Sequence, residues 1–177
     1  MAMELPKFKY HPNPLATGAI SESTEVCECC EKARGYIYTA SFYSAEEVEA
    51  ICPWCIADGS AAEKYDGSFS DEYPLMESGI SEEVTEEVCK RTPGFISWQQ
   101  EIWQCHCGAP CEFHGDAEKQ DIEELSGSTL ESFLSTNMVK PEYWVGILQH
   151  YEKAGNPAVY KFKCIKCGEV IFSMDFT

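Results

Sequence analysis

The residues best suited to chemistry in this chain of 177 residues are cysteines at metal-ligand spacing. Two pairs, Cys27/Cys30 and Cys52/Cys55, have the Cys-x-x-Cys form and follow one another at the interval common in structural zinc sites. One such pair supplies two thiolates from a tight turn, and tetrahedral Zn²⁺ needs a second pair to complete its coordination. The spacing therefore predicts a first structural zinc site.

A second set of ligands is indicated in the C-terminal half. Cys164 and Cys167 form another Cys-x-x-Cys pair, and the stretch 104–111 offers three cysteines and a histidine for the two remaining positions. We choose Cys107 and Cys111, because glycine and proline between them shape a turn. Two zinc ions per chain are therefore expected, the second tying the middle of the chain to its end. The substitutes left open here are Cys105, His106 and His114.

Three other residues are weaker candidates as ligands. Cys29 is an alternative to Cys30, although the x-x spacing suits a zinc knuckle better. Cys89 falls on the inner side of a predicted helix and is expected in the core. His11 stands between a tyrosine and a proline and is expected to be a packed or exposed loop residue rather than a ligand.

Composition narrows the class of protein. The formal net charge of −17 argues against nucleic acid and anionic membranes, which need a basic surface, and favours a basic protein partner. No long apolar run predicts a membrane span, and 1–20 lacks the pattern of a secretory signal. The protein is therefore expected in the cytoplasm, where the paired cysteines among its eleven are expected as metal ligands rather than as disulfides.

Local patterns around the first two pairs predict a treble-clef-like zinc finger. Aromatic and β-branched residues over 35–43 indicate a strand or hairpin. Ser44 and Glu47 form a capping box, which predicts a helix over 44–51 that ends at the second cysteine pair. A further helix is expected over 55–64, where its N-terminal dipole would favour thiolates.

The other predicted elements place a second, zinc-ribbon-like site after a helical segment. The fold class is α+β, a small zinc-stabilised fold with residues 1–80 as the first module and 81–177 as the second, joined in one compact unit. The remaining elements, in order, are an extended arm over 1–26 with a strand over 7–10, a loop over 65–80, helices over 81–89, 95–103, 128–135 and 141–151, and strands over 159–163 and 170–176.

Five segments carry a family resemblance. They are Lys7-Phe8-Lys9-Tyr10-His11-Pro12-Asn13-Pro14 with Thr17-Gly18, Cys52-Pro53-Trp54-Cys55-Ile56-Ala57-Asp58-Gly59, Arg91-Thr92-Pro93-Gly94, Trp98-Gln99 and His106-Cys107-Gly108. Together they resemble the CbrC-like family of bacterial proteins, associated with colicin tolerance, over nearly the whole chain. The resemblance implies protection against a protein toxin. It also implies that the eight chosen cysteines are the family's pairs, with Cys29, Cys89 and Cys105 outside the pattern.

Three functions follow from these observations, and no catalytic residue is assigned. The first is a non-enzymatic immunity protein that binds and neutralises a basic bacterial toxin, such as a nuclease. The second is a zinc-ribbon adaptor or regulator for a cellular protein, and the third is a zinc-dependent enzyme. Two acidic stretches are either solvated faces or the partner surface; their residues are Glu82, Glu83, Glu86, Glu87, Asp116, Glu118, Asp121, Glu123 and Glu124.

Overall fold

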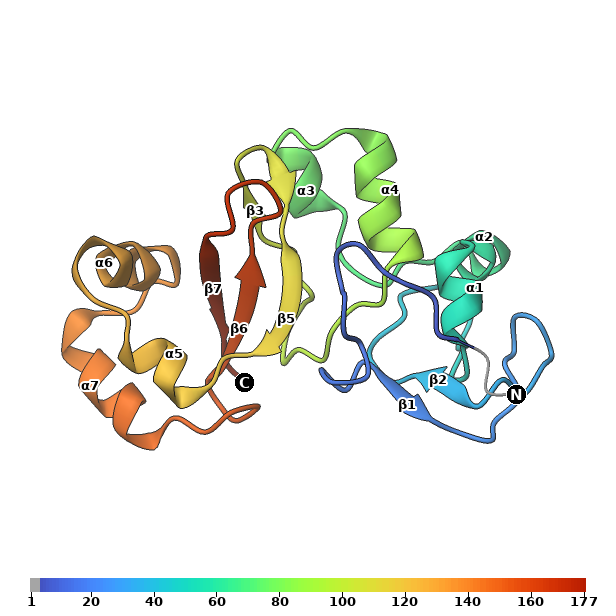
Figure 1. The fold of residues 1–177 in the computed structure, drawn as a ribbon, viewed down its shortest axis with the longest axis horizontal. Helices are drawn as coiled ribbons and strands as arrows, with labels where there is room; N and C mark the ends of the chain where they lie inside the picture. The colour runs from blue at the N-terminus through green and yellow to red at the C-terminus, as the bar shows by residue number, and fades with distance from the viewer. Residues whose placement is uncertain (1–3) are drawn as a thin grey trace.

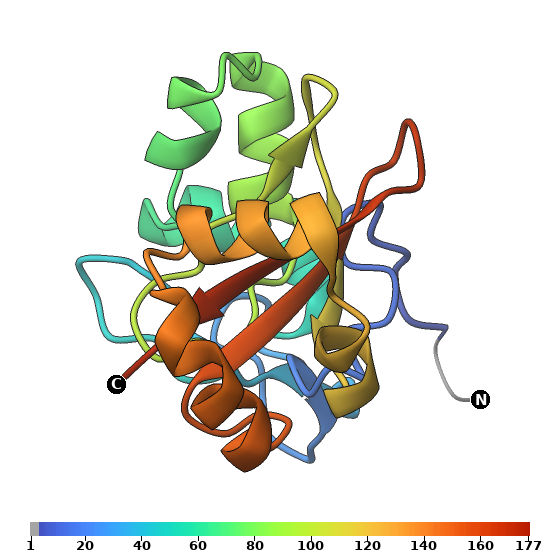
Figure 2. The same ribbon diagram turned by 90° about the vertical axis from the view of Figure 1, so that its left-hand side faces the viewer.

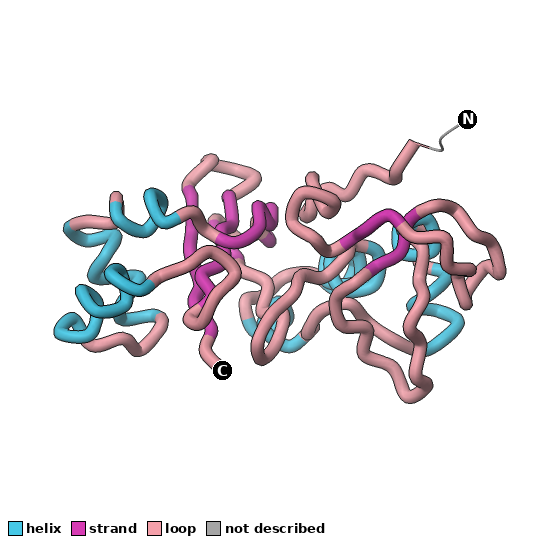
Figure 3. The backbone as a smooth tube through the Cα atoms, turned by 90° about the horizontal axis from the view of Figure 1, so that it is seen from below, coloured by secondary structure: helices cyan, strands magenta, loops and turns pink. Residues whose placement is uncertain are grey.

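A three-stranded antiparallel sheet lies in the middle of the molecule, with one group of helices on one side and the N-terminal half on the other (Figures 1 and 3). The computed structural model describes residues 4–177. Its elements in chain order are β1 (Ile20–Glu22), β2 (Tyr36–Tyr38), α1 (Pro53–Ala57), α2 (Ser60–Tyr65), α3 (Tyr73–Glu77), α4 (Glu82–Arg91), β3 (Cys105–His106), β4 (Ala109–Pro110), β5 (Glu112–Asp116), α5 (Lys119–Glu123), α6 (Gly127–Thr136), α7 (Pro141–His150), β6 (Ala158–Lys163) and β7 (Val170–Asp175). The protein is therefore a mixed α/β structure.

The central sheet has the order β5-β6-β7, so β7 is one of its two edge strands. β6 pairs with β7 along its whole length, from Ala158 opposite Asp175 to Lys163 opposite Val170. The pairing of β5 with β6 shifts register between Phe113 and Asp116. Helices α5, α6 and α7 lie to one side of this sheet, and α6 crosses in front of β6 and β7 in Figure 2.

Three hydrophobic clusters make up the core. The first surrounds Cys27, Cys52 and Cys55, the second is an aromatic cluster around Phe95 on the central sheet, and the third lies beneath α5, α6 and α7. In the second cluster Phe95 stacks on Phe113 with ring centroids 4.3 Å apart. Burial of large aromatic side chains at this density supplies most of the hydrophobic stabilisation of such a fold.

The N-terminal arm is packed into the structure and does not form the predicted strand over 7–10. Phe8 is buried in the first cluster and Tyr10 in the second, so alternate side chains connect two parts of the core. The carbonyl of Tyr10 accepts a hydrogen bond of 2.7 Å from the N–H of Phe113. Residues 1–3 of the predicted arm lie outside the described residues.

Two predicted helices are wrong, because side chains capture backbone groups that a helix would use. Over 44–51 the N–H groups of Glu49 and Ala50 both donate to the carboxylate of Glu28, at 2.8 Å each. Over 95–103 the N–H groups of Trp98 and Gln99 donate to the carboxylate of Asp175, at 2.8 and 3.1 Å. Both stretches are irregular as a result.

Two more predictions need correction. The predicted loop over 65–80 contains α3, a short helix with a proline in its first turn, where the missing N–H costs nothing. The single helix predicted over 55–64 is divided into α1 and α2, because Gly59 has a φ of +80°. The predicted elements that the structure confirms, with ends that differ by at most two or three residues, are α4, α6, α7, β6 and β7.

Within residues 4–177, no helix has both the length and the apolar character needed to cross a bilayer.

Candidate metal centres

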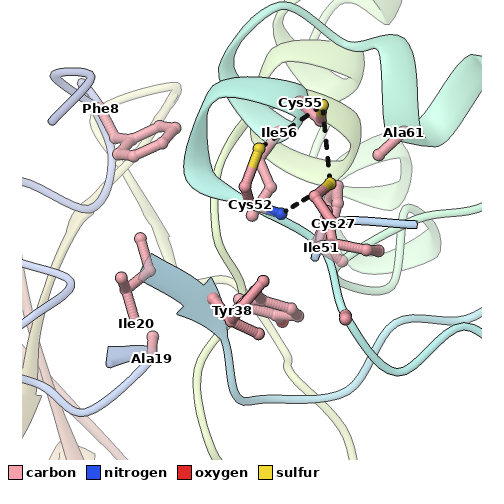
Figure 4. Close-up of a cluster of buried hydrophobic side chains, with 13 residues drawn as sticks. Phe8, Ala19, Ile20, Cys27, Tyr38, Ile51, Cys52, Cys55, Ile56 and Ala61 are labelled. Atoms are coloured by element: carbon pink, nitrogen blue, oxygen red, sulfur yellow. Dashed lines mark hydrogen bonds between the residues drawn. The ribbon is translucent and has the colours of Figure 1, made fainter. Parts of the chain in front are cut away.

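The first cysteine cluster brings together the four ligands predicted for it. Cys27 and Cys30 lie on a tight turn, closed by a 2.7 Å hydrogen bond from the N–H of Glu31 to the carbonyl of Cys27. Cys52 is the N-cap of α1 and Cys55 lies in its first turn. The ligand atoms of all four cysteines lie within 4.8 Å of one another. Figure 4 shows Cys27, Cys52 and Cys55 facing one another above the hydrophobic cluster.

The distances in this cluster fit a tetrahedral metal site. The Sγ atoms are separated by 3.9 Å for Cys27 and Cys55, 3.8 Å for Cys30 and Cys52, and 3.6 Å for Cys52 and Cys55. Zinc–sulfur bonds of about 2.3 Å in a regular tetrahedron place the sulfurs about 3.8 Å apart. The spacing is far above the ~2.05 Å of a disulfide bond, and all four thiols are free. The donor set therefore fits a thiolate-bound metal ion.

Hydrogen bonding in the first cluster favours thiolate at one position. The thiol of Cys52 and several backbone N–H groups lower the pKa of Cys27 to about 4, and its Sγ accepts from the N–H of Cys52 at 3.2 Å. The hydrogen bond of the Cys52 thiol to Cys27 and its burial raise the pKa of Cys52, and a second thiolate beside that of Cys27 would be repelled by it. Burial raises the pKa of Cys55 to about 12. A cation among these sulfurs would relieve that repulsion and allow the remaining thiols to ionise.

The second cluster is built from a hairpin and a knuckle. Strands β3 and β4 are joined by a two-residue turn at Cys107 and Gly108, whose φ angles are +53° and +66°. Two positive φ values in such a turn are typical of a type I′ hairpin, and they place Cys107 at the exposed tip. Cys164 and Cys167 form the turn between β6 and β7, where Gly168 has a φ of +78°.

The ligand atoms of the second cluster come from His106, Cys107, Cys164 and Cys167, all within 4.8 Å of one another. The Nδ1 atom of His106 lies 3.3 Å from the Sγ of Cys107 and 3.4 Å from the Sγ of Cys167. Nitrogen and sulfur ligands on one tetrahedral zinc ion are about 3.6 Å apart, given bonds of about 2.05 and 2.3 Å. The arrangement therefore fits a metal site with three cysteines and one histidine.

The surroundings of this cluster orient its ligands. The other ring nitrogen of His106, Nε2, lies 3.6 Å from a carboxylate oxygen of Glu169. A carboxylate behind a metal-bound histidine fixes the tautomer and makes the ligand nitrogen more basic. Backbone N–H groups of the knuckle lower the pKa of Cys164 to about 6. The carbonyl of Cys107 accepts a 2.9 Å hydrogen bond from the ammonium group of Lys166.

His106 occupies the ligand position that the sequence predicts for Cys111. The N–H of Cys111 donates to the carbonyl of Gln104 on the opposite strand of the hairpin, at 2.9 Å. The pair next to the turn is His106 with Ala109, and Cys111 lies two residues after Ala109, about 7 Å farther along the strand. Its side chain is fully buried in the aromatic cluster, and burial raises the pKa of its thiol to about 12. The predicted ligand pair, Cys107 with Cys111, is therefore corrected to His106 and Cys107, which are adjacent at the tip of the hairpin.

The other candidate ligands lie outside both clusters. Cys105 is half-buried and packs against the aromatic cluster, while His114 pairs with Glu112 at 3.0 Å. Cys29 points to the hydroxyl of Ser60 at 3.6 Å. As predicted, Cys89 is a core residue. His11 is a packed loop residue, one of the two environments predicted for it, and its ring contacts Thr17 and Pro93.

The two acidic stretches differ in how many of their carboxylates pair with lysine. On α4, Glu82 and Glu83 are exposed in the first turn, and Glu86 forms a salt bridge of 3.4 Å with Lys90. In the second stretch two carboxylates already have partners: Glu118 pairs with Lys153, and Asp121 with Lys161 at 2.7 Å. Burial raises the pKa of Asp116. The exposed carboxylates remaining in this second stretch are Glu123 and Glu124.

The fold and its two clusters define a class: a mixed α/β protein with two sets of ligands, each able to hold a metal ion. Residues 5–176 match the family described as "Uncharacterised protein family (UPF0167)", and the chain belongs to this family.

Its relatives are bacterial and are similar along their whole length. The chain is 47% identical to a UPF0167 protein of Pseudomonas aeruginosa over 175 residues, which covers 98% of each chain. It is 38% identical over 183 residues to UPF0167 proteins of Mycobacterium bovis and Mycobacterium tuberculosis, covering 98% of this chain and 94% of theirs. No solved structure matches it. The matches confirm membership of a bacterial family, and the CbrC-like name rests on the sequence motifs alone.

Proposed function

We propose that this protein is a non-enzymatic, zinc-stabilised binding protein of the cytoplasm whose acidic surface binds a basic protein partner. The observation that carries the proposal is that each cluster offers four protein ligand atoms within 4.8 Å of one another. Four protein ligands complete a tetrahedral coordination and leave no open position for water or substrate, as in structural zinc sites. Binding of the metal would then contribute directly to the stability of the fold.

The proposal includes the fold types expected for the two centres. A knuckle at 27–30 with a second pair carried by α1 supports a treble-clef-like N-terminal finger. Two turns that face each other, one at the tip of β3–β4 and one between β6 and β7, support a zinc-ribbon-like second centre. In this proposal the metals hold distant segments together and take no part in a reaction.

Helix α4 is the acidic surface that we propose as the first point of contact. The chain carries a net charge of −17, and within residues 4–177 the exposed Glu82 and Glu83 at the start of α4 have no lysine partner, whereas Glu118 and Asp121 near α5 do. A basic partner would be steered toward such a surface at rates that fall with ionic strength. This favours α4 over α5 within the proposal.

A hollow beside α4 supports the same choice. It lies between α3 and α4, has a volume of about 390 Å³, and is lined by Glu72, Glu82, Glu86 and Lys90. Thr85 also lines it; this residue is buried, and its hydroxyl has no hydrogen-bond partner among the described residues. Three carboxylates against one ammonium group, with an unpaired hydroxyl, suit the lysine or arginine side chain of a partner.

The partner that we propose is a basic toxin domain of the nuclease type, which the CbrC-like motifs imply and the net charge suits. A nuclease domain is basic because its substrate is polyanionic, so an acidic protein can cover the surface that binds nucleic acid. A basic cellular protein is the alternative partner, in which case the protein is an adaptor. Both use the same face of this chain.

The experiment measures binding of a purified basic nuclease-type toxin domain by surface plasmon resonance at several salt concentrations. The double variant Glu82→Lys/Glu83→Lys is compared with Glu123→Lys/Glu124→Lys, which makes the same change of charge at the C-terminal end of α5. We expect the α4 variant to lower the association rate at least tenfold and to weaken its salt dependence. Equal binding by the two variants and the parent protein would contradict the choice of surface. Absence of binding, with binding to a cellular protein instead, would favour the adaptor.

A further inference from the structure

The outer edge of β7 carries backbone groups that point away from the sheet. The N–H of Met174 donates to the side-chain oxygen of Asn137 at 2.8 Å, so the backbone groups of Met174 point away from β6. Glu169, an odd number of residues away, has its backbone turned the other way: its carbonyl accepts from the N–H of Cys164, next to β6, at 2.8 Å. Because the backbone groups of successive residues in an antiparallel strand point in alternate directions, those of Val170 and Phe172 also point away from the sheet. Within residues 4–177, β7 pairs with no strand on this side.

Two adjoining hollows run along β7. One, of about 520 Å³, is lined by its second half, and the other, of about 420 Å³, by its first half, so together they contact every residue of the strand. Both are lined by Gln104 and Thr136, which mark where they meet. The walls come from the segment 99–106 and from α6, which lies across the strand in Figure 2. We call this combined hollow the β7 groove.

The β7 groove is acidic at both ends. None of its lining residues is a lysine or arginine, while Glu169 lines one end and Asp175 the other. The Oδ2 atom of Asp175 accepts hydrogen bonds from Trp98, Gln99 and Tyr160, and its Oδ1 atom has no partner among the described residues. Glu169 precedes β7 and Asp175 is its last residue, so six residue steps of about 3.3 Å separate the two residues by about 20 Å along the strand.

We propose that the β7 groove binds an extended peptide segment of another protein, which adds a fourth strand to the sheet. The outward N–H and C=O groups of Val170 and Phe172 would supply main-chain hydrogen bonds, as in other cases of strand addition to an open edge. The acidic ends select a segment with a lysine or arginine at each end, and the span of β7 sets its length at about six residues. Hydroxyl groups of α6, at Ser132 and Thr136, line the groove beside it.

This inference goes beyond the proposed function, because it requires neither the acidic face of α4 nor a toxin. The probe is an end-blocked peptide, Lys-Val-Ser-Val-Ser-Lys, titrated into the isotope-labelled holoprotein and followed by amide NMR. We expect saturable shifts at Val170 and Phe172. The same peptide with glutamate in place of both lysines should bind at least tenfold more weakly, as should one with N-methyl groups on alternate amides.

Two protein variants locate the site. Thr136→Trp places a large side chain where the two hollows meet, and we expect it to weaken binding of the lysine peptide at least tenfold. Ser135→Trp makes the same change at the neighbouring exposed position of α6, which does not line the groove, and should leave binding unchanged. Both sites are exposed, so neither variant disturbs the core.

Three results would overturn the proposal: no shifts along β7 with millimolar lysine peptide, equal binding of the glutamate or N-methylated peptide, or full affinity in the Thr136→Trp variant. Pairing of two β7 edges in a homodimer that Thr136→Trp dissociates would also overturn it, in favour of a second copy as occupant. Charge reversal at Glu82 and Glu83 should leave peptide binding intact, which separates this test from that of the proposed function.

Discussion

Protonation of His11 should destabilise the fold, since its ring is fully buried between the N-terminal arm and the segment after α4. Its Nδ1 atom lies 2.9 Å from the carbonyl of Pro93, and its Nε2 atom lies 2.6 Å from the hydroxyl of Thr17. The carbonyl can only accept, so Nδ1 carries the proton. Nε2 then accepts from the hydroxyl of Thr17, whose other acceptor, the carbonyl of Pro14, is farther away at 3.2 Å. The ring also meets Phe113 edge-on, with centroids 5.0 Å apart. This environment suits a neutral imidazole.

The size of the effect follows from the pKa. Burial lowers the pKa of His11 from 6.5 to about 4, so the unfolded chain binds more protons than the folded one between these values. The stabilisation is complete above pH 6.5 and is lost as the pH falls toward 4. Linkage with these two pKa values gives a loss of about 2 kcal/mol between pH 7.5 and pH 5, and about 3 kcal/mol by pH 4.

The assay is urea unfolding at a series of pH values, with saturating zinc so that both centres stay filled. The variant His11→Asn keeps an N–H donor near Pro93 but cannot titrate in this range. It should be less stable than the parent at pH 7.5, and the difference should shrink by about 2 kcal/mol at pH 5. Loss of metal at acidic pH affects both proteins equally, so the difference between their free energies of unfolding reports on the titration of His11.

A direct titration of the His11 ring by NMR provides a second measurement that does not depend on the variant. We expect the ring to stay neutral at pH 5 and to protonate near pH 4. A ring that titrates at pH 6 or above, or a stability difference that does not change with pH, would refute the reasoning. Either result would mean that solvent reaches the ring through the N-terminal arm.

Two further predictions concern the second metal centre and a close contact of the backbone. His106→Ala should reduce the zinc content from two ions per chain to one, while Cys111→Ser should keep both, as measured by mass spectrometry of the metal; the opposite result would restore the cysteine pair expected from the sequence. Gly94→Ala should cost about 3 kcal/mol or more in thermal unfolding, because its Cβ would overlap the carbonyl oxygen of Phe69. The control Gly146→Ala, with open space around a helical position, should stabilise by about 0.5–1 kcal/mol; equal effects of the two changes would contradict the packing.

The sequence was most informative where one local rule decides the structure. Two Cys-x-x-Cys pairs were sufficient to predict the first cluster, since turn geometry fixes each pair and metal coordination joins them. Ser81 predicted the start of α4, and its hydroxyl does accept a hydrogen bond from Val84 at 3.5 Å. Pro141 likewise marks the first turn of α7. These signals act over three or four residues and need no tertiary contact.

Predictions failed where a distant group decided the outcome. The capping box at Ser44 is real in sequence, but Glu28 captures the following N–H groups from another part of the chain. The aromatic residues over 95–103 have helical spacing, yet Asp175 binds the backbone there from near the C-terminus. For the second centre, the His-Cys-Gly signal of a ligand-bearing hairpin was present at His106, but spacing alone did not decide between it and Cys111.

The two centres have different mechanical roles, because they close loops of different length in different surroundings. In the first, the linked residues Cys27 and Cys55 are 28 positions apart and lie within a hydrophobic cluster that packs around them. In the second, His106 and Cys167 are 61 positions apart, and two of the four ligands are exposed. A longer loop costs more entropy to close, although only logarithmically. The larger difference is therefore in packing: the first centre is supported by the hydrophobic cluster around it, whereas a metal in the second would itself hold the hairpin tip against the start of β7.

Glu169, at the acidic end of the β7 groove, lies behind the histidine of the second centre. The position of the groove's acidic end would then depend on the metal.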